Sequence, residues 1–201
     1  MERKEAIVRL DELVGKELHD LANKHGVTIY KDGKVNKGWA GHVLERHLGL
    51  PINSAQSPNF GSWELKSVPL KQLKNGQWTV KETMAVTMID PVNVMQKEFK
   101  DSHLLSKLCK AVIVVRKVGK SVDEPSFIHS IVEFDLEGED YQIIENDYNI
   151  VRNILLNNAN GFGLLSGKLG TYIQPRTKGQ GHGSTSRAFY ARTSFLKKII
   201  L

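Results

Sequence analysis

The segment Pro58–Lys66, with the sequence PNFGSWELK, is the part of the chain that most limits the choice of fold. Trp63 and Leu65 alternate with Glu64 and Lys66, as expected of a short strand in which successive side chains point to opposite faces. Glu64 and Lys66 should therefore lie side by side on one face. A carboxylate can ligate a divalent cation, and a neighbouring lysine can position or activate water in phosphodiester hydrolysis.

The tripeptide pattern of an acidic residue, any residue and lysine has little specificity by itself, because a solvated surface pair produces the same letters. Its context separates this occurrence from the others, since only this one lies on a predicted strand with apolar neighbours. The other matches lie in helical or turn segments: Glu2–Lys4, Asp32–Lys34 and Glu98–Lys100.

The composition is that of an ordinary globular domain, and its basic residues are unevenly distributed. The 201 residues carry a net charge of +6, yet residues 148–201 contain eight Lys and Arg and no Asp or Glu. Such a segment predicts a polyanionic partner, of which a nucleic acid is the commonest. A solubilising tail is the alternative, but the segment also contains many apolar and aromatic residues.

Cysteine content and hydropathy indicate where the chain functions. Cys109 is the single cysteine, so no internal disulfide can form, which fits a reducing, cytoplasmic setting. No apolar run approaches the ~18 residues needed to cross a bilayer, so we expect no membrane partner.

The periodicity of apolar residues predicts an α/β (α+β) fold with a mixed central sheet flanked by helices. One domain is expected over residues 1–201. Helices are predicted over 5–25, 37–49, 101–109 and 139–157. Strands are predicted near 62–68, 79–89, 111–115, 127–134 and 171–173, and a strand followed by a helical turn from about 186. The first two strands should form a hairpin that turns at Lys74–Gly76.

Several segments, in order along most of the chain, resemble the MutH-like DNA endonuclease family. Residues 37–49 are similar to a helix that supplies an accessory acidic residue, and Glu64–Leu70 resembles the family's catalytic strand. Ser102 and His103 with Lys107 recur in the same relative place, and Tyr172–Lys178 and Arg187–Tyr190 resemble its DNA-recognition segments. The family contains mismatch-repair nicking enzymes and type II restriction enzymes, several acting at GATC. Its fold is of the PD-(D/E)xK restriction-endonuclease class.

The resemblance implies Mg²⁺ as cofactor and assigns a role to particular residues. Glu64 and the backbone carbonyl of Leu65 would ligate the metal, and Lys66 would orient the water. Glu45 would support the metal site from its helix, and Lys107 would lie near it. For these last two, a solvated surface role is the alternative.

The resemblance also implies double-stranded DNA with a short specific site as the partner, contacted mainly by residues of about 160–195. An arginine can make a bidentate contact with guanine, whereas a lysine suits phosphates or acceptor edges. Tyr190 matches a tyrosine near the target base, although a core aromatic is an equal alternative. The residues expected to contact DNA are Arg176, Lys178, Arg187, Tyr190 and Arg192.

Asn59 departs from the family pattern, which places an aspartate ligand upstream of the catalytic strand. An amide oxygen is neutral and is a weaker ligand for Mg²⁺ than a carboxylate. A literal register from Glu64 places Ser57 at this position instead, and neither residue restores the charge. Because Glu64, Lys66 and Glu45 are all present, we favour a variant inactivated by replacement of Asp with Asn59 over a natural domain that has lost catalysis.

The resulting prediction is a Mg²⁺-dependent type II restriction endonuclease, inactive or impaired at Asn59, that acts as a monomer or a transient dimer on DNA. A mismatch-repair nicking endonuclease and a catalytically silent, sequence-specific DNA-binding domain are alternatives. A basic RNA-binding scaffold is a third alternative from outside the nuclease class.

Overall fold

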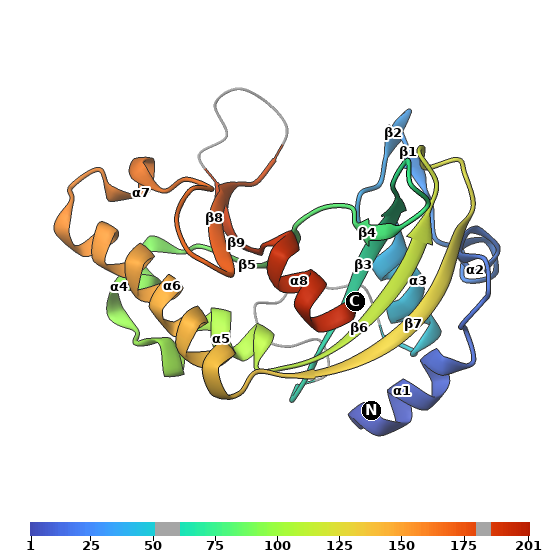
Figure 1. Cartoon of the computed structure of the whole chain (residues 1–201), viewed down its shortest axis with the longest axis horizontal. Coiled ribbons are helices and arrows are strands. Elements are labelled where there is room, and N and C mark those ends of the chain that lie inside the picture. Colours follow the sequence, from blue (N-terminus) through green and yellow to red (C-terminus); the bar gives the residue numbers. More distant parts are fainter. Residues whose placement is uncertain (51–60, 180–185) are drawn as a thin grey trace.

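A four-stranded mixed sheet forms the centre of the computed structural model, which describes residues 1–50, 61–179 and 186–201 (Figure 1). The strand order is β4 (Trp78–Val80), β3 (Glu64–Gln72), β6 (Lys110–Val118) and β7 (Ser126–Asp135). β3 and β6 are parallel, whereas β4 and β7 run antiparallel to their neighbours. The apolar run 111–115 is buried within β6, as expected of a strand covered on both faces. The predicted mixed sheet with flanking helices is thereby confirmed.

A second, three-stranded antiparallel sheet has the order β5 (Met84–Met88), β9 (Arg187–Ala191) and β8 (Ile173–Thr177). The prediction of one strand over 79–89 was therefore wrong, because β4 and β5 belong to different sheets. The N–H of Lys81 still donates to the carbonyl of Pro69 at 2.9 Å, after which the chain bends at Glu82 and leaves the central sheet. A separate small hairpin joins β1 (Tyr30–Lys31) to β2 (Lys34–Val35).

Three N-terminal helices cover one face of the central sheet: α1 (Arg3–Asp11), α2 (Leu18–Lys24) and α3 (Trp39–His47). Trp63 and Leu65 point into this layer. The single helix predicted over 5–25 was wrong, because it is interrupted at Gly15, where φ is +81°. The N–H of Gly15 donates to the carbonyl of Ile128 at 2.8 Å, so pairing with β7 replaces helical hydrogen bonds here.

The opposite face carries the larger core, to which the remaining helices and the second sheet contribute. In Figure 1, α8 crosses the space between the two sheets. None of the helices in the described ranges combines the length and apolarity required to span a bilayer. The elements of this layer are α4 (Pro91–Gln96), the 3₁₀ helix η1 (Phe99–Asp101), α5 (His103–Leu108), α6 (Gly138–Asn157), α7 (Gly161–Leu164) and α8 (Thr193–Ile200).

Asp147 of α6 connects this helix to the start of β8. Its buried carboxylate accepts hydrogen bonds from the backbone N–H groups of Thr171, Tyr172 and Ile173 at 2.6, 2.7 and 2.8 Å. Because the N–H of the buried Ile173 would otherwise have no acceptor, the carboxylate supports the chain where the second sheet begins.

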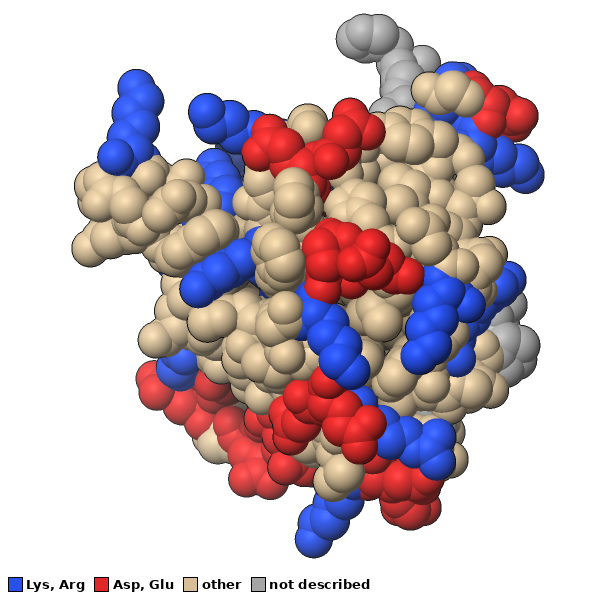
Figure 2. Space-filling view, turned by 90° about the vertical axis from the view of Figure 1, so that its right-hand side faces the viewer, with Lys and Arg blue, Asp and Glu red and all other residues tan. Residues whose placement is uncertain are grey.

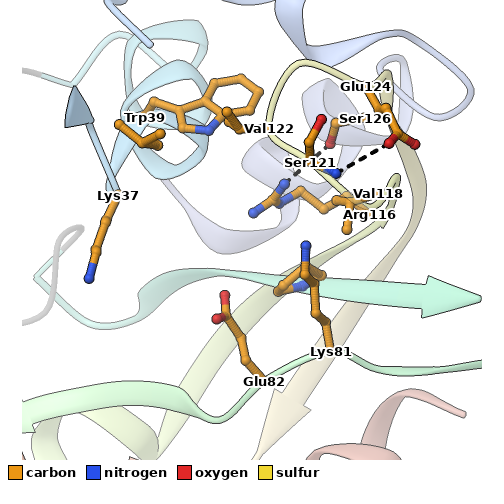
Figure 3. Close-up of a pocket in the computed structure, with 12 residues that line it drawn as sticks. Lys37, Trp39, Lys81, Glu82, Arg116, Val118, Ser121, Val122, Glu124 and Ser126 are labelled. Atoms are coloured by element: carbon orange, nitrogen blue, oxygen red, sulfur yellow. Dashed lines mark hydrogen bonds between the residues drawn. The ribbon is translucent and has the colours of Figure 1, made fainter. Parts of the chain in front are cut away.

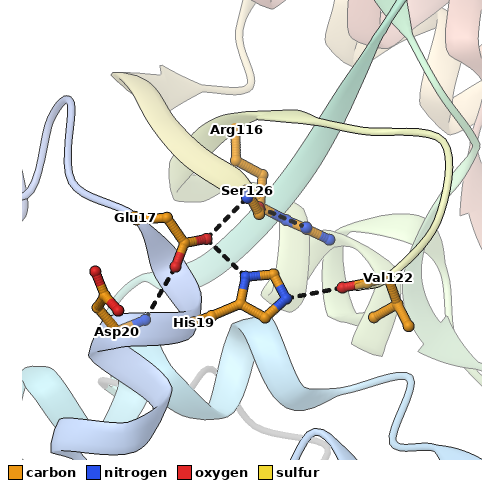
Figure 4. Close-up of polar contacts among 6 residues, drawn as sticks. All are labelled: Glu17, His19, Asp20, Arg116, Val122 and Ser126. Carbon is orange, nitrogen blue, oxygen red and sulfur yellow. Dashed lines mark hydrogen bonds and ion pairs between the residues drawn. The ribbon is translucent and has the colours of Figure 1, made fainter. Parts of the chain in front are cut away.

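A polar cluster attaches α2 to the turn between β6 and β7 (Figure 4). His19 Nδ1 lies 2.6 Å from Glu17 Oε1, and His19 Nε2 lies 2.7 Å from the carbonyl oxygen of Val122. Glu17 Oε1 also accepts the N–H of Ser126 at 2.9 Å. Since both partners of the ring are acceptors, both ring nitrogens donate when His19 is protonated. Burial lowers the pKa of His19, but Glu17 and the Val122 carbonyl together raise it by a larger amount. The pKa of His19 is therefore raised above the ordinary value of histidine.

Charges of both signs are interspersed on the side of the molecule that carries α1, α2 and β7 (Figure 2). Acidic patches separate the Lys and Arg side chains on this side, so it presents no continuous basic surface.

Candidate active site

Glu64 is the first residue of β3, and only 2% of its surface is exposed. Lys66 Nζ lies 2.7 Å from Glu64 Oε1, on the same face of the strand. Lys107 Nζ lies 3.2 Å from Oε1 and 3.1 Å from Oε2 of the same carboxylate, so two ammonium groups hold it. Lys107 is itself buried rather than solvated at the surface.

The topology explains why these three side chains meet. In the parallel register of β3 and β6, Glu64 is opposite Ala111 and Lys66 is opposite Ile113. The helix α5 immediately precedes β6, so its last turn carries Lys107 to the end of β3 where Glu64 lies. The start of α5 is determined by Ser102, whose Oγ accepts the N–H of Leu105 at 3.1 Å.

The cluster has the net charge of a site that binds an anion. Two ammonium groups accompany one carboxylate, so the three side chains carry a net positive charge that an additional phosphate would complement. A divalent cation alone would compete with both lysines for the carboxylate oxygens. A phosphodiester group, which carries one negative charge, would balance the net charge of these three side chains.

The described donors fit a magnesium ion only partly. Within residues 1–50, 61–179 and 186–201, no group of three or more His, Cys, Asp or Glu side chains could hold a metal. Mg²⁺, however, is commonly held by one or two carboxylates with waters and substrate phosphates, and Glu64 can supply one of these. The half-buried Glu45 belongs to α3, which packs against the other face of β3. Asn59 and Ser57 lie outside the described residues.

The chain is similar to known proteins over the segment that contains this cluster. The family model described as "DNA mismatch repair enzyme MutH" matches residues 48–147, a range that contains Glu64, Lys66 and Lys107. The DNA mismatch repair protein MutH of Vibrio campbellii is 26% identical over 214 residues, which cover 98% of this chain and 92% of that protein. The chain belongs to the MutH-like endonuclease family.

Other relatives show how far the similarity of this MutH-like chain extends. The type II restriction enzyme Sau3AI of Staphylococcus aureus is 26% identical over 208 residues, covering 96% of the chain and 41% of that enzyme. The MutH protein of Vibrio cholerae is 31% identical over 114 residues, covering 55% of the chain and 49% of that protein. Members of the family are DNA endonucleases, and the relatives include both a repair protein and a restriction enzyme.

Two of the predicted DNA-contacting residues lie together on the second sheet. Arg176 of β8 is exposed, and its guanidinium carbon lies 5.6 Å from the centre of the Tyr190 ring on β9. Arg176 Nη1 also donates to Thr83 Oγ1 at 2.9 Å, which orients the guanidinium. Lys178 is exposed just beyond the end of β8.

The other two predicted arginines donate to backbone carbonyls of their own region. Arg187 Nε donates to Phe162 O at 2.7 Å, and its Nη2 donates to Gly163 O at 3.2 Å. Arg192 donates to the carbonyls of Gly167 and Leu169, each at 2.8 Å from Nη2. These contacts shape the segment before β8, and DNA contact by Arg187 and Arg192 stays a prediction.

The periodicity of the sequence did not identify two residues that support the site. Ser102 was named only as part of the family resemblance, although its position before the apolar pattern of α5 also fits the helix N-cap rule. Thr83 gives no comparable signal, because its contact with Arg176 joins residues 93 positions apart.

Proposed function

We propose that this chain is a type II restriction endonuclease of the MutH-like class, which hydrolyses phosphodiester bonds in double-stranded DNA at a short specific site with Mg²⁺. The buried Glu64 carboxylate, held by Lys66 and Lys107, is the observation that carries this proposal. The bacterial relatives support a cytoplasmic enzyme, and we treat residues 1–201 as one nuclease domain.

Each residue of the cluster has a distinct task in this proposal. Glu64 and the carbonyl of Leu65 would hold the metal. A bound divalent cation would polarise the phosphate and lower the pKa of a bound water. Lys66 would orient the attacking water, and Lys107 would compensate the charge of the phosphate as it arrives. Glu45 would support the metal site from α3. These tasks place the hydrolysis at the start of β3.

DNA recognition is assigned to the second sheet and its flanking segments. Arg176 is already oriented by Thr83 and Tyr190, so little side-chain freedom is lost when it contacts a base. Lys178 would contact phosphates, and Tyr190 would lie near the recognised bases. Arg187 and Arg192 would also contribute to DNA recognition, by holding the backbone carbonyls to which they donate.

Asn59 decides whether the chain as it stands cleaves DNA. We propose that it replaces an aspartate ligand, so that this form binds DNA but cuts it poorly. The alternative of a catalytically silent binding domain predicts that restoring the carboxylate has no effect. A mismatch-repair nicking enzyme is the second candidate function, and it is favoured by the 92% coverage of a MutH protein.

Cleavage of supercoiled plasmid tests these alternatives together. The chain, its Asn59→Asp variant and an Asn59→Asp/Glu64→Gln variant are incubated with Mg²⁺, and Asn146→Asp on the exposed side of α6 serves as the matched control. If only the Asn59→Asp variant cleaves the plasmid, a linear product supports a restriction enzyme and an open-circular product supports a nickase. Absence of any product, with DNA binding retained, would establish the silent-domain alternative.

A further inference from the structure

A second site lies on the other face of β3, in a cavity of about 290 Å³ between β2, the start of α3 and the turn between β6 and β7 (Figure 3). Arg116 of β6 projects into this cavity, and Lys37 and Lys81 lie at its rim. Arg116 is opposite Pro69, five positions beyond Glu64 along β3, which is roughly 16 Å at the rise of a strand. The cavity is therefore separated from the Glu64 cluster both by this distance and by its position on the opposite face of β3.

Two hydroxyl groups hold the Arg116 side chain in one orientation. Its Nε donates to Ser67 Oγ at 3.0 Å, and its Nη1 donates to Ser126 Oγ at 3.2 Å. The guanidinium carbon also lies 5.8 Å from the centre of the Trp39 ring. Arg116 is therefore oriented before any ligand arrives, which reduces the entropy lost on binding.

The outer edge of the guanidinium is the part of Arg116 that remains available. Among the described residues, Arg116 forms no ion pair, and Nη2 and the second hydrogen of Nη1 donate to no protein acceptor. Burial lowers the pKa of Arg116 to about 10, although the charge of Glu82 opposes this shift. A buried cation without an anion is costly, and these two nitrogens can form a bidentate contact with an oxyanion.

The other charges of the cavity favour an anion over a cation. Lys37, Lys81 and Arg116 bring three positive charges, against the carboxylates of Glu82 and Glu124. The Glu124 carboxylate already accepts the N–H groups of Lys120 and Ser121 at 3.0 and 3.4 Å. Glu82 is exposed at the rim, where solvent weakens its effect on a ligand.

We propose that the Arg116 cavity is a binding site for a phosphate-class oxyanion, separate from the Glu64 cluster. The ligand is either a backbone phosphate of bound DNA or a free phosphate group, and both present the same tetrahedral acceptors to Arg116. Binding to this site requires neither metal nor cleavage, so it is independent of the nuclease proposal.

Titration of the full chain with inorganic phosphate tests the site. Sodium chloride at equal ionic strength is the control, and the melting temperature and the heat of binding are measured. We expect the unmodified chain to bind phosphate saturably. Arg116→Met should weaken this binding about tenfold or more, because one charge-assisted contact is lost. Arg9→Met, an exposed arginine outside the cavity, should bind phosphate as the unmodified chain does. If Arg116→Met does not fold, Lys81→Met at the exposed rim should still weaken phosphate binding several-fold.

The salt dependence of binding to a short DNA duplex identifies the source of the phosphate. A DNA phosphate in the cavity predicts that Arg116→Met lowers the slope of log affinity against log salt by about one. An unchanged slope, together with lost phosphate binding, assigns the site to a free phosphate group. The proposal is overturned if phosphate binds Arg116→Met and Lys81→Met as well as the unmodified chain. It is also overturned if the unmodified chain shows no saturable phosphate binding and Arg116→Met leaves the slope unchanged.

Discussion

At the scale of single residues, the arrangement of Glu64 between two lysines should be sensitive to substitution. Side-chain exposure is 3% for Glu64 and 8% for Lys107, so their interaction is poorly screened by solvent. Removal of either partner leaves the other charge in a buried environment, which is more costly than the loss of a surface pair.

A double-mutant cycle with Glu64→Gln and Lys107→Met should therefore give a coupling free energy of unfolding of about 2 kcal/mol. The same cycle on Glu5 and Arg9, an exposed pair of α1 with side chains 49% and 48% exposed, should give about 0.3–0.5 kcal/mol. Urea unfolding of the two sets measures both quantities. Equal coupling in the two cycles would contradict the proposed role of burial.

Residue-level chemistry was predictable where it depends on neighbours in sequence. The pairing of Glu64 with Lys66 follows from the two-residue period of a strand, and their 2.7 Å contact agrees with it. Lys107 is 43 residues from Glu64, so no local pattern places them together, and only the family resemblance pointed to it. Arg116 was not identified as a site, because its anchors come from β3 and β7.

At the scale of elements, helix α6 and the second sheet depend on one carboxylate. Asp147→Asn keeps the shape of the side chain but replaces one acceptor oxygen by a donor that faces backbone N–H groups. We expect a loss of about 3 kcal/mol in unfolding free energy, since hydrogen bonds to a charged acceptor are lost.

The Asp147→Asn variant should also weaken DNA binding, because β8 carries Arg176. Glu145→Gln on the same helix is the matched control and should change neither property. Chemical unfolding and DNA titration measure the two effects separately. A fully stable Asp147→Asn variant would show that the start of β8 does not need this carboxylate.

The contact of α2 with the turn between β6 and β7 should depend on pH. The pKa of His19 is raised in the folded protein, so its contribution to stability is complete below its unfolded value of about 6.5. That contribution is lost as the pH rises through the higher, folded pKa. The destabilisation caused by His19→Gln should thus be larger at about pH 5.5 than at about pH 8.5.

The opposite sign is expected at His129 of β7, whose pKa is lowered by burial and by Lys117. The His129→Gln substitution serves as the control, because its cost should not fall as the pH rises. Denaturant unfolding of both variants across this range measures the difference. A cost of His19→Gln that is independent of pH would mean that its imidazolium form is not the one that stabilises the turn.

The existence of elements was predictable from periodicity, whereas several boundaries were not. The continuous pattern over 5–25 does not reveal that Gly15 pairs with Ile128 of β7, a contact made only in the folded chain. Likewise, the β-forming residues of 79–89 are locally uniform, and the change of sheet at Glu82 depends on pairing with β3 and β9.

At the scale of the whole molecule, the uneven distribution of charge should govern the affinity for DNA. Lys178 lies in the acid-free segment, whereas Lys4 belongs to the part of the chain with slightly more acidic than basic residues. Lys178→Gln should lower the slope of log affinity against log salt by about one, as expected for a phosphate contact.

The Lys4→Gln variant, which makes the same change of net charge, should leave that slope unaltered. Fluorescence anisotropy with a labelled duplex at several salt concentrations measures both slopes. Identical slopes in the two variants would indicate that net charge, rather than its location, controls binding.

The parallel pairing of β3 with β6 also has a consequence for the order in which the protein folds. Glu64 and Lys107 are joined by a crossover of 43 residues, whose closure must precede their contact. During synthesis, the strand with the acidic group leaves the ribosome before its lysine partner and before β6. A nascent chain therefore passes through a period in which the Glu64 cluster is not assembled, and any cleavage of DNA that depends on this cluster must wait until the crossover has closed.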